Sequence, residues 1–121
     1  MLVIRNAQMA ALGRPMLERY VRKTLRDIRE LFPGDPRFEE EAAVRALIGH
    51  GISSARRYGI EGEREVSLYI FLACEYGSDF DTQGDKPWIQ SLLAAENLDA
   101  SSKMDLIYER LRILAAGRSE L

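Results

Sequence analysis

The segment from residue 63 to residue 76 constrains the fold more than any other part of the sequence. It opens with three charged residues, 63–65, and is then apolar on nearly every side of a helix, through Val66, Leu68, Tyr69, Ile70, Phe71, Leu72 and Ala73. A helix that is apolar all round is stable only where neighbouring elements cover it. Aromatic and branched residues also favour strands, but the acidic start and Gly77 at the end are typical of a capped helix. We therefore expect a central apolar helix over residues 63–76.

A long amphipathic helix is predicted before this segment. Pro15 suits the first turn of a helix, and Pro33 ends the pattern. Between them, apolar residues follow the three-and-four spacing of one helix face, at Leu17, Tyr20, Val21, Leu25, Ile28 and Phe32. Closer to the start of the chain, Asn6 is a candidate cap for a short helix that carries Met9 and Leu12.

Glycines are expected to divide the next part of the chain into two short helices. The acidic residues 39–41 suit the N-terminus of the first, and Gly49 and Gly51 are expected to end it. His50, between the two glycines, is expected to partly neutralise the C-terminal dipole of that helix. A further turn or two of helix is predicted over residues 52–58.

Two more helices complete the predicted fold. Asp85 is a candidate cap for a helix that has Pro87 in its first turn and carries inward Trp88, Leu92 and Leu93. The last helix is expected to start at Ser101 or Ser102 and to end before Gly117. The sequence therefore predicts an all-α fold, a compact single-domain bundle of about five to six helices that includes all 121 residues.

The composition removes most catalytic and metal chemistry. The only cysteine, Cys74, permits no internal disulfide or thiolate cluster, and the only histidine, His50, removes sites built on two imidazoles. Neither GxGxxG nor GxxxxGK occurs, so nucleotide binding is not expected. The acidic loop 79–85 matches a calcium loop at its first, third and sixth positions, but Gln83 and Gln90 stand at its fifth and twelfth. We therefore expect no enzyme activity, no cofactor and no bound metal ion.

The apolar segments are too short for a membrane protein. The longest uninterrupted apolar run, residues 68–74, has seven residues, and a spanning helix needs about 20. Arg5 and Asn6 interrupt the part of the N-terminus where a secretory signal would be apolar. We therefore expect a cytoplasmic protein without membrane insertion.

Charge is distributed unevenly along the chain. The net charge is −2, but residues 1–29 carry +5 and residues 30–121 carry −7. Four arginines at spacings of three and four form a basic stripe on the predicted long helix: Arg19, Arg22, Arg26 and Arg29. The stripe is either a solvated face that pairs with nearby acids or a binding face for an acidic partner or for phosphate. Nucleic acid is not an expected partner, because lysines number only three and no aromatic residues interleave with the stripe.

Two further groups are candidates for contact with a protein partner. Phe80 lies within the acidic loop and Trp88 follows it, and both are either core residues beneath the loop or aromatic anchors for a partner. The apolar lead at the start of the chain is suited to adding to a sheet edge or groove of a partner, through Leu2, Val3 and Ile4.

Several sparse residues occur in an order that is typical of one bacterial family. They are Met1, Leu2, Val3, Ile4 and Arg5 with Gln8 and Met9, then Tyr58, Gly59 and Ile60, then Glu65 and Val66, then Asp79, Phe80 and Asp81, and then Pro87 and Trp88. From Met1 to about Met104, the chain resembles small proteins that are encoded beside type VI secretion adaptor chaperones, VgrG spike proteins and their toxic effectors. The resemblance implies a cytoplasmic co-chaperone that helps the adaptor to keep an effector soluble and to load it. It implies no enzyme activity and assigns no binding residues.

We therefore expect a protein-binding module whose partners are an adaptor chaperone, a secreted effector or both. The alternative is an immunity protein of the same gene neighbourhood, which would cover the active site of a toxin with its acidic face. A third class is a hydrolase that uses Asp79, Asp81 or Asp85 with a metal ion. It is disfavoured because these aspartates also suit helix capping and no histidine is near them in the sequence.

Overall fold

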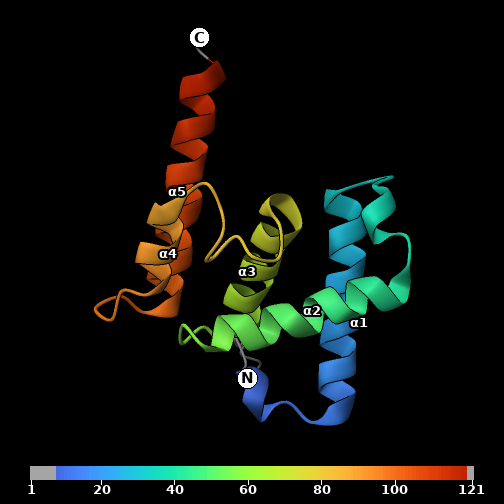
Figure 1. Ribbon diagram of the computed structural model, residues 1–121. Helices are drawn as coiled ribbons and strands as arrows, with labels where there is room; N and C mark the ends of the chain where they lie inside the picture. Colours follow the sequence, from blue (N-terminus) through green and yellow to red (C-terminus); the bar gives the residue numbers. More distant parts are fainter. Residues whose placement is uncertain (1–7, 120–121) are drawn as a thin grey trace, which may run out of the picture.

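A computed structural model describes residues 8–119 of the chain (Figure 1). The described residues form five α-helices and two short 3₁₀ turns: η1 (Met9–Ala11), α1 (Arg14–Leu31), η2 (Pro36–Phe38), α2 (Glu41–Arg56), α3 (Glu63–Tyr76), α4 (Pro87–Leu93) and α5 (Ala100–Ser119). They contain no strand, and a single isolated bridge pairs Gln8 with Gly62. The prediction of an all-α bundle is confirmed.

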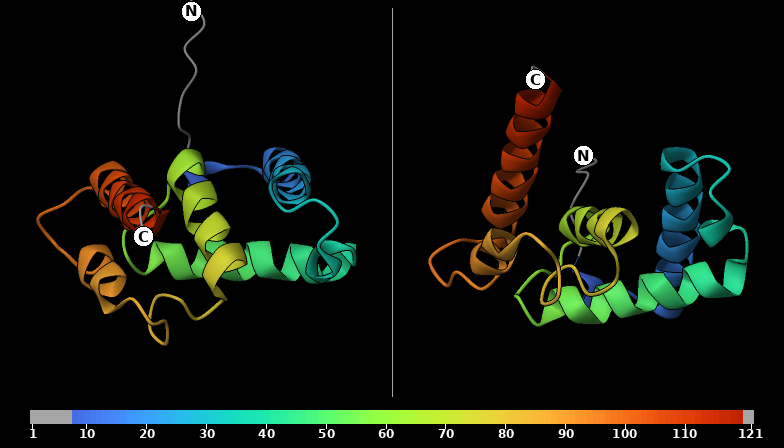
Figure 2. Two further views of the ribbon diagram at one scale, coloured as in Figure 1. Left: turned by 90° about the horizontal axis from the view of Figure 1, so that it is seen from above. Right: turned by 45° about the horizontal axis from the view of Figure 1, so that its top comes forward.

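Helix α3 is the centre of the fold, as its apolar sequence predicts. It packs against α1, α2 and α5, and Figures 1 and 2 show α1 and α5 on its two sides with α2 crossing it. Seven of its residues are buried: Glu65, Val66, Tyr69, Ile70, Leu72, Ala73 and Cys74. The helix ends at Gly77, which adopts a φ of 103° that only glycine accepts without strain. The capped apolar helix predicted over residues 63–76 is therefore confirmed.

Helix α1 also follows its predicted pattern, except at Leu17, which is 38% exposed. Pro15 lies in its first turn, and the N–H of Phe32 closes the helix on the carbonyl of Ile28. Its inner face buries Tyr20, Thr24, Leu25 and Ile28. Before α1, the short helix expected around Met9 is a single 3₁₀ turn, and the cap expected at Asn6 lies outside the described residues.

Helix α2 corrects the prediction of two short helices. It runs without a break from Glu41 to Arg56, through both Gly49 and Gly51. Gly51 is buried against α3, and a Cβ added to it would lie 2.6 Å from Cγ1 of Ile70. The glycine therefore permits a close crossing of two helices and does not end one. The prediction that it ends a helix is wrong because a glycine needed for contact between helices looks, in one sequence, like a glycine at a cap.

The role predicted for His50 is wrong for the same reason. Because α2 continues past it, His50 lies inside the helix and not at its C-terminus. Its side chain is exposed, and its Nε2 lies 3.3 Å from Oγ of Ser54, one turn further along. The histidine therefore does not face the terminal carbonyls of the helix.

The caps of the last two helices also differ from the prediction. Helix α4 has Pro87 in its first turn, but no side chain caps it, and the exposed Asp85 contacts Nζ of Lys86. The cap of α5 is Asp99, whose Oδ1 accepts the N–H of Ser102 at 2.8 Å. This hydrogen bond lowers the pKa of Asp99 below its ordinary value. Helix α5 continues through Gly117, where it was expected to end.

Candidate protein-binding groove

An apolar groove opens between α1, α3 and α5. Its volume is about 500 Å³. Leu68, Phe71 and Leu72 of α3 line it together with Leu31 at the end of α1 and Leu111 of α5. A concave apolar surface of this kind on a helical protein is typical of a site for side chains of a partner. We refer to it below as the α3 groove.

The rim of the α3 groove is partly open to solvent. Leu31 is 56% exposed and Tyr76 is 39% exposed, so both present apolar surface at the rim, with Nζ of Lys86 5.0 Å from the centroid of the Tyr76 ring. Glu75 and Arg112 also line the groove and supply one charge of each sign. An apolar floor with a charged rim is the usual composition of a protein-binding patch.

Tyr108 fixes the geometry of the groove wall. Its ring lines the groove, and its hydroxyl donates a hydrogen bond of 2.7 Å to the carbonyl oxygen of Leu68 on α3. Burial raises the pKa of this hydroxyl well above its ordinary value, so it remains a neutral donor at physiological pH. Helix α5 is thereby held to α3 along the groove.

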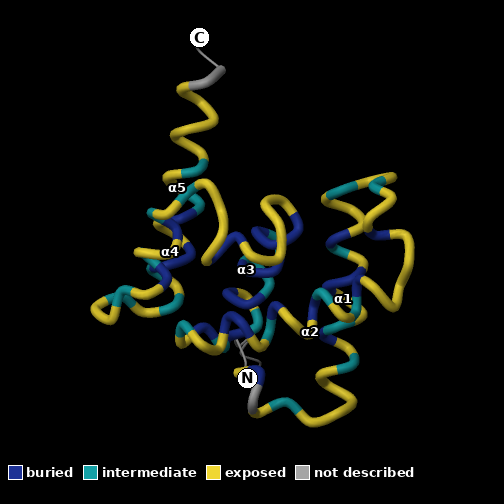
Figure 3. Tube along the Cα trace, in the orientation of Figure 1, coloured by how far each residue is buried: buried dark blue, intermediate teal, exposed yellow. Residues whose placement is uncertain are grey.

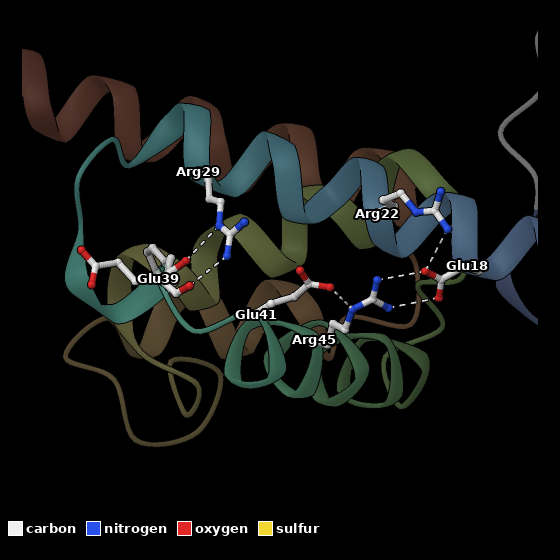
Figure 4. Close-up of polar contacts among 7 residues, drawn as sticks. Glu18, Arg22, Arg29, Glu39, Glu41 and Arg45 are labelled. Atoms are coloured by element: carbon white, nitrogen blue, oxygen red, sulfur yellow. Dashed lines mark hydrogen bonds and ion pairs between the residues drawn. The ribbon is translucent and has the colours of Figure 1, made fainter.

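Two arginines of the basic stripe bind groups of the chain itself (Figure 4). Arg22 forms an ion pair of 3.4 Å with Glu18, one turn earlier on α1. Arg29 donates from Nε and Nη2 to the carbonyl oxygens of Phe38 and Glu39, each at 3.0 Å. Arg29 therefore holds the end of η2 against α1, and this part of the stripe has a structural role.

The other two arginines of the stripe remain on the surface. Arg19 and Arg26 are exposed. Nη1 of Arg19 lies 3.9 Å from Sδ of Met16, one turn earlier on the same helix. These two side chains are therefore accessible to an acidic partner, as is Arg22, whose side chain is 71% exposed in spite of its ion pair.

Arg45 of α2 forms a contact with α1 that was not predicted from the sequence. Its guanidinium donates to both carboxylate oxygens of Glu18 on α1, at 3.0 and 2.9 Å, and to Glu41 at 2.9 Å (Figure 4). The hydrogen bond from Arg45 is the main cause that lowers the pKa of Glu18. The Glu41–Arg45 spacing of four residues was visible in the sequence, but the approach of α1 was not.

The structure places the aromatic candidates at different depths. Phe80 is 3% exposed, and its ring centroid lies 4.9 Å from that of Tyr69, so Phe80 belongs to the core. Trp88 is half-buried, and the guanidinium carbon of Arg110 lies 4.6 Å from its ring centroid. The apolar lead of Leu2, Val3 and Ile4 lies outside the described residues.

The acidic loop contributes a buried contact. Asp81 is buried and accepts a hydrogen bond of 2.7 Å from the hydroxyl of Tyr58. The carbonyl oxygen of Tyr58 accepts another of 2.8 Å from Nζ of the buried Lys103 on α5. Between residues 8 and 119, no group of three or more histidine, cysteine, aspartate or glutamate side chains is placed to hold a metal ion. Asp81 therefore joins the loop to the corner after α2, and Tyr58 joins that corner to α5.

Tyr58 is expected to ionise only at strongly alkaline pH. Burial, together with the hydrogen bond to Asp81 and its charge, raises the pKa of Tyr58 from 10.0 to about 12. The neutral hydroxyl is the donor, so its stabilising contribution is complete below pH 10 and is lost as the pH rises through about 12. The difference between the phenolate absorbance titrations of the wild type and Tyr58→Phe measures this transition. A difference curve centred on the ordinary tyrosine pKa would contradict the Tyr58–Asp81 contact.

Cys74 and Ser54 carry groups that can act as nucleophiles, but neither group is activated in the part of the chain that the structure describes. Burial raises the pKa of the Cys74 thiol to about 11, so the thiol is protonated at neutral pH. His50 lies near Ser54, but among the described residues no carboxylate contacts its ring to orient it.

No protein-family model, no curated protein and no solved structure matches the chain. In the part of the chain that the structure describes, no helix combines the length and apolarity required to cross a bilayer. The structural support for a functional proposal therefore comes from the chain's own surface, on which the α3 groove is one apolar opening.

Proposed function

We propose that this protein is a cytoplasmic binding module, a co-chaperone that works with an adaptor chaperone to stabilise and load a type VI secretion effector. The observation that supports a binding role is the α3 groove, an apolar opening of about 500 Å³ with exposed leucine and tyrosine side chains at its rim. The family resemblance supplies the identity of the partners.

The groove suits an amphipathic helix of the adaptor. Its floor is a row of α3 side chains that includes Leu68, Phe71 and Leu72, which is the surface that apolar residues at positions i, i+3 and i+4 of a partner helix can fill. Leu31 and Tyr76 at the rim would become buried, and a few such apolar contacts supply most of the affinity of a helix in a groove. Glu75 and Arg112 would then fix the orientation of the partner helix through its own charges.

The exposed arginines of the basic stripe would attract an acidic surface of the adaptor. Arg19 and Arg26 have no role in holding the described fold together comparable to that of Arg29. Charges at the edge of an interface chiefly accelerate association, and salt screens them. Binding through the groove with steering by these arginines is therefore expected to weaken moderately, and not to vanish, at high salt.

The test is binding to the adaptor chaperone whose gene the resemblance implies beside the gene of this protein, measured by calorimetry with purified proteins. We expect Leu31→Asp to weaken binding at least about tenfold, because it places a charge where the interface would exclude water. Met16→Asp is the matched control, since Met16 is 47% exposed on the same helix but does not line the groove. The control is expected to bind like the wild type.

Two results would contradict the proposal. Absence of binding between the wild-type protein and the adaptor would overturn the co-chaperone role, and equal binding by the two aspartate variants would exclude the groove as the site. Unchanged effector abundance and export after deletion of the gene would also count against the role in loading.

The alternative function is that of an immunity protein, and the acidic character of residues 30–121, with a charge of −7, favours it. A basic substrate-binding surface of a toxin would be attracted to such a protein. This alternative predicts that coexpression rescues a cell from the cognate toxin and that the toxin is bound without the adaptor. A toxin that still kills on coexpression would reject it.

A further inference from the structure

The side of helix α5 that faces away from the α3 groove carries exposed apolar residues. Leu106 is 45% exposed and Ile113 is 55% exposed. Both line a shallow apolar hollow of about 480 Å³, to which Leu92 of α4 and Leu114 also contribute. Figure 3 shows the C-terminal half of α5 as largely exposed, and Figures 1 and 2 show it extending beyond the other helices.

Four residues of this side form what we call the outer α5 stripe: Leu106, Glu109, Arg110 and Ile113. Leu106 and Ile113 are seven residues apart, which is about two helical turns, so they share one face. Glu109 and Arg110 lie between them. Along the helix, the stripe therefore has an apolar, an acidic, a basic and an apolar residue, in this order. Its two apolar positions lie at equal distances from the midpoint between residues 109 and 110, and so do its two charged positions.

We propose that two copies of this chain associate through the outer α5 stripe, with their α5 helices antiparallel about a two-fold axis at the midpoint between residues 109 and 110. In this arrangement Leu106 of each copy meets Ile113 of the other, and Glu109 of each copy meets Arg110 of the other. A two-fold contact uses the same patch on both subunits, so the patch has to complement itself. The outer α5 stripe meets this condition in both apolar surface and charge.

The charge pattern is what favours a second copy over another partner. An antiparallel copy places an acid opposite a base at both symmetric positions, whereas a surface of uniform charge would repel either Glu109 or Arg110. Both side chains are already oriented within the chain, since Glu109 accepts hydrogen bonds from Arg112 at 3.2 and 2.6 Å and Arg110 lies over the ring of Trp88. A carboxylate can accept several hydrogen bonds and a guanidinium carries five N–H donors, so both can take a further partner.

This association would leave the α3 groove free. Tyr108 and Leu111 line the groove, whereas Leu106 and Ile113 line the hollow outside it. Binding of an adaptor in the groove and pairing through α5 are therefore separate properties, and the failure of one would leave the other intact.

Sedimentation equilibrium over a concentration series tests the proposal. We expect the wild type to approach about twice the 13.7 kDa mass of one chain. Ile113→Asp is expected to raise the dissociation constant of the dimer at least about tenfold, because each dimer then buries two unpaired charges. The groove variant Leu31→Asp serves as the matched control and is expected to leave the dimer intact.

A charge exchange separates the proposed pairing from a general loss of structure. Glu109→Arg alone or Arg110→Glu alone would place like charges opposite each other and weaken the dimer about tenfold. The double variant Glu109→Arg/Arg110→Glu restores opposite charges across the axis and is expected to recover most of the affinity. Circular dichroism of each variant shows whether the helices are retained.

Three results would overturn the proposal. The first is a wild type that remains at the mass of one chain at every concentration. The second is a folded double variant that associates no better than the single variants. The third is loss of the dimer in Leu31→Asp, which would move the contact to the groove.

Discussion

Gly51→Val is expected to lower the free energy of unfolding by about 3 kcal/mol, at the upper end of the usual cost of overpacking a core. Even a single Cβ at this position would lie 2.6 Å from Cγ1 of Ile70. Ile70 has no exposed surface and is held by its own helix, so it cannot move aside without disturbing α3. The substitution would therefore separate α2 from the central helix.

Gly49→Val is the matched control for this prediction. Gly49 lies in the same helix, but a Cβ added to it would meet no atom within 4 Å. Valine has a better helix propensity than glycine by a few tenths of a kcal/mol, so this variant is expected to be neutral or slightly stabilised. Urea unfolding followed by circular dichroism gives both free energies. Equal values for the two variants would show that the crossing of α2 and α3 does not require a glycine.

Tyr69→Ala is expected to cost about 3–5 kcal/mol, the range for removal of a large aromatic side chain from a core. The ring of Tyr69 is 1% exposed, and its centroid lies 6.3 Å from that of Tyr58 and 4.9 Å from that of Phe80. Tyr69 thus joins α3 to both of these rings. The cavity would therefore loosen the corner after α2 and the acidic loop together.

Tyr69→Phe separates the contribution of the hydroxyl to stability from that of the ring. The hydroxyl is buried and has no hydrogen-bond partner among the described residues, and burial is the main cause that raises its pKa, with the charge of Asp81 next. Removing an unsatisfied buried polar group is neutral or stabilising, so the phenylalanine variant is expected to match or exceed the wild type in urea unfolding. A loss above about 1 kcal/mol would mean that the hydroxyl is hydrogen-bonded in solution, to water or to Asp81.

The helices that the sequence predicted correctly are those whose pattern is local. In α1, the three-and-four spacing and Pro15 are enough to define a face and a start. In α3, the apolar surface on all sides could only be covered in the centre of the fold. Neither prediction depends on which residues of the other helices pack against α1 or α3.

The errors concern residues whose role depends on a neighbour distant in the sequence. Gly51 has the same local signal as a cap, and only Ile70 of α3 shows that it permits a close crossing. From the sequence alone, Arg45 is expected to form only a surface pair with Glu41. In the structure, α1 places Glu18 within hydrogen-bond distance of Arg45. Asp99 was passed over as a cap because Ser101 and Ser102 follow it and are also good capping residues.

The α3 groove was missed because its lining residues look like core residues in the sequence. Leu68 and Phe71 have the same apolar character in the sequence as the buried Ile70. The sequence therefore does not show whether the three helices pack closely or leave a groove between them. One signal was present in α5, where Leu111 lies on a different face of the helix from Leu106 and Ile113. Apolar residues on more than one face of a terminal helix indicate more than one contact.

The hydrogen bond from Tyr108 to the carbonyl of Leu68 sets the rotation of α5 about its own axis, and this has a consequence for the length of the helix. Insertion or loss of one residue after Tyr108 would rotate every later side chain by about 100°. Leu111 would turn out of the groove and Ile113 off the outer stripe in the same step. Single side chains on α5 can therefore change one surface at a time, whereas a change in the number of residues would alter both at once.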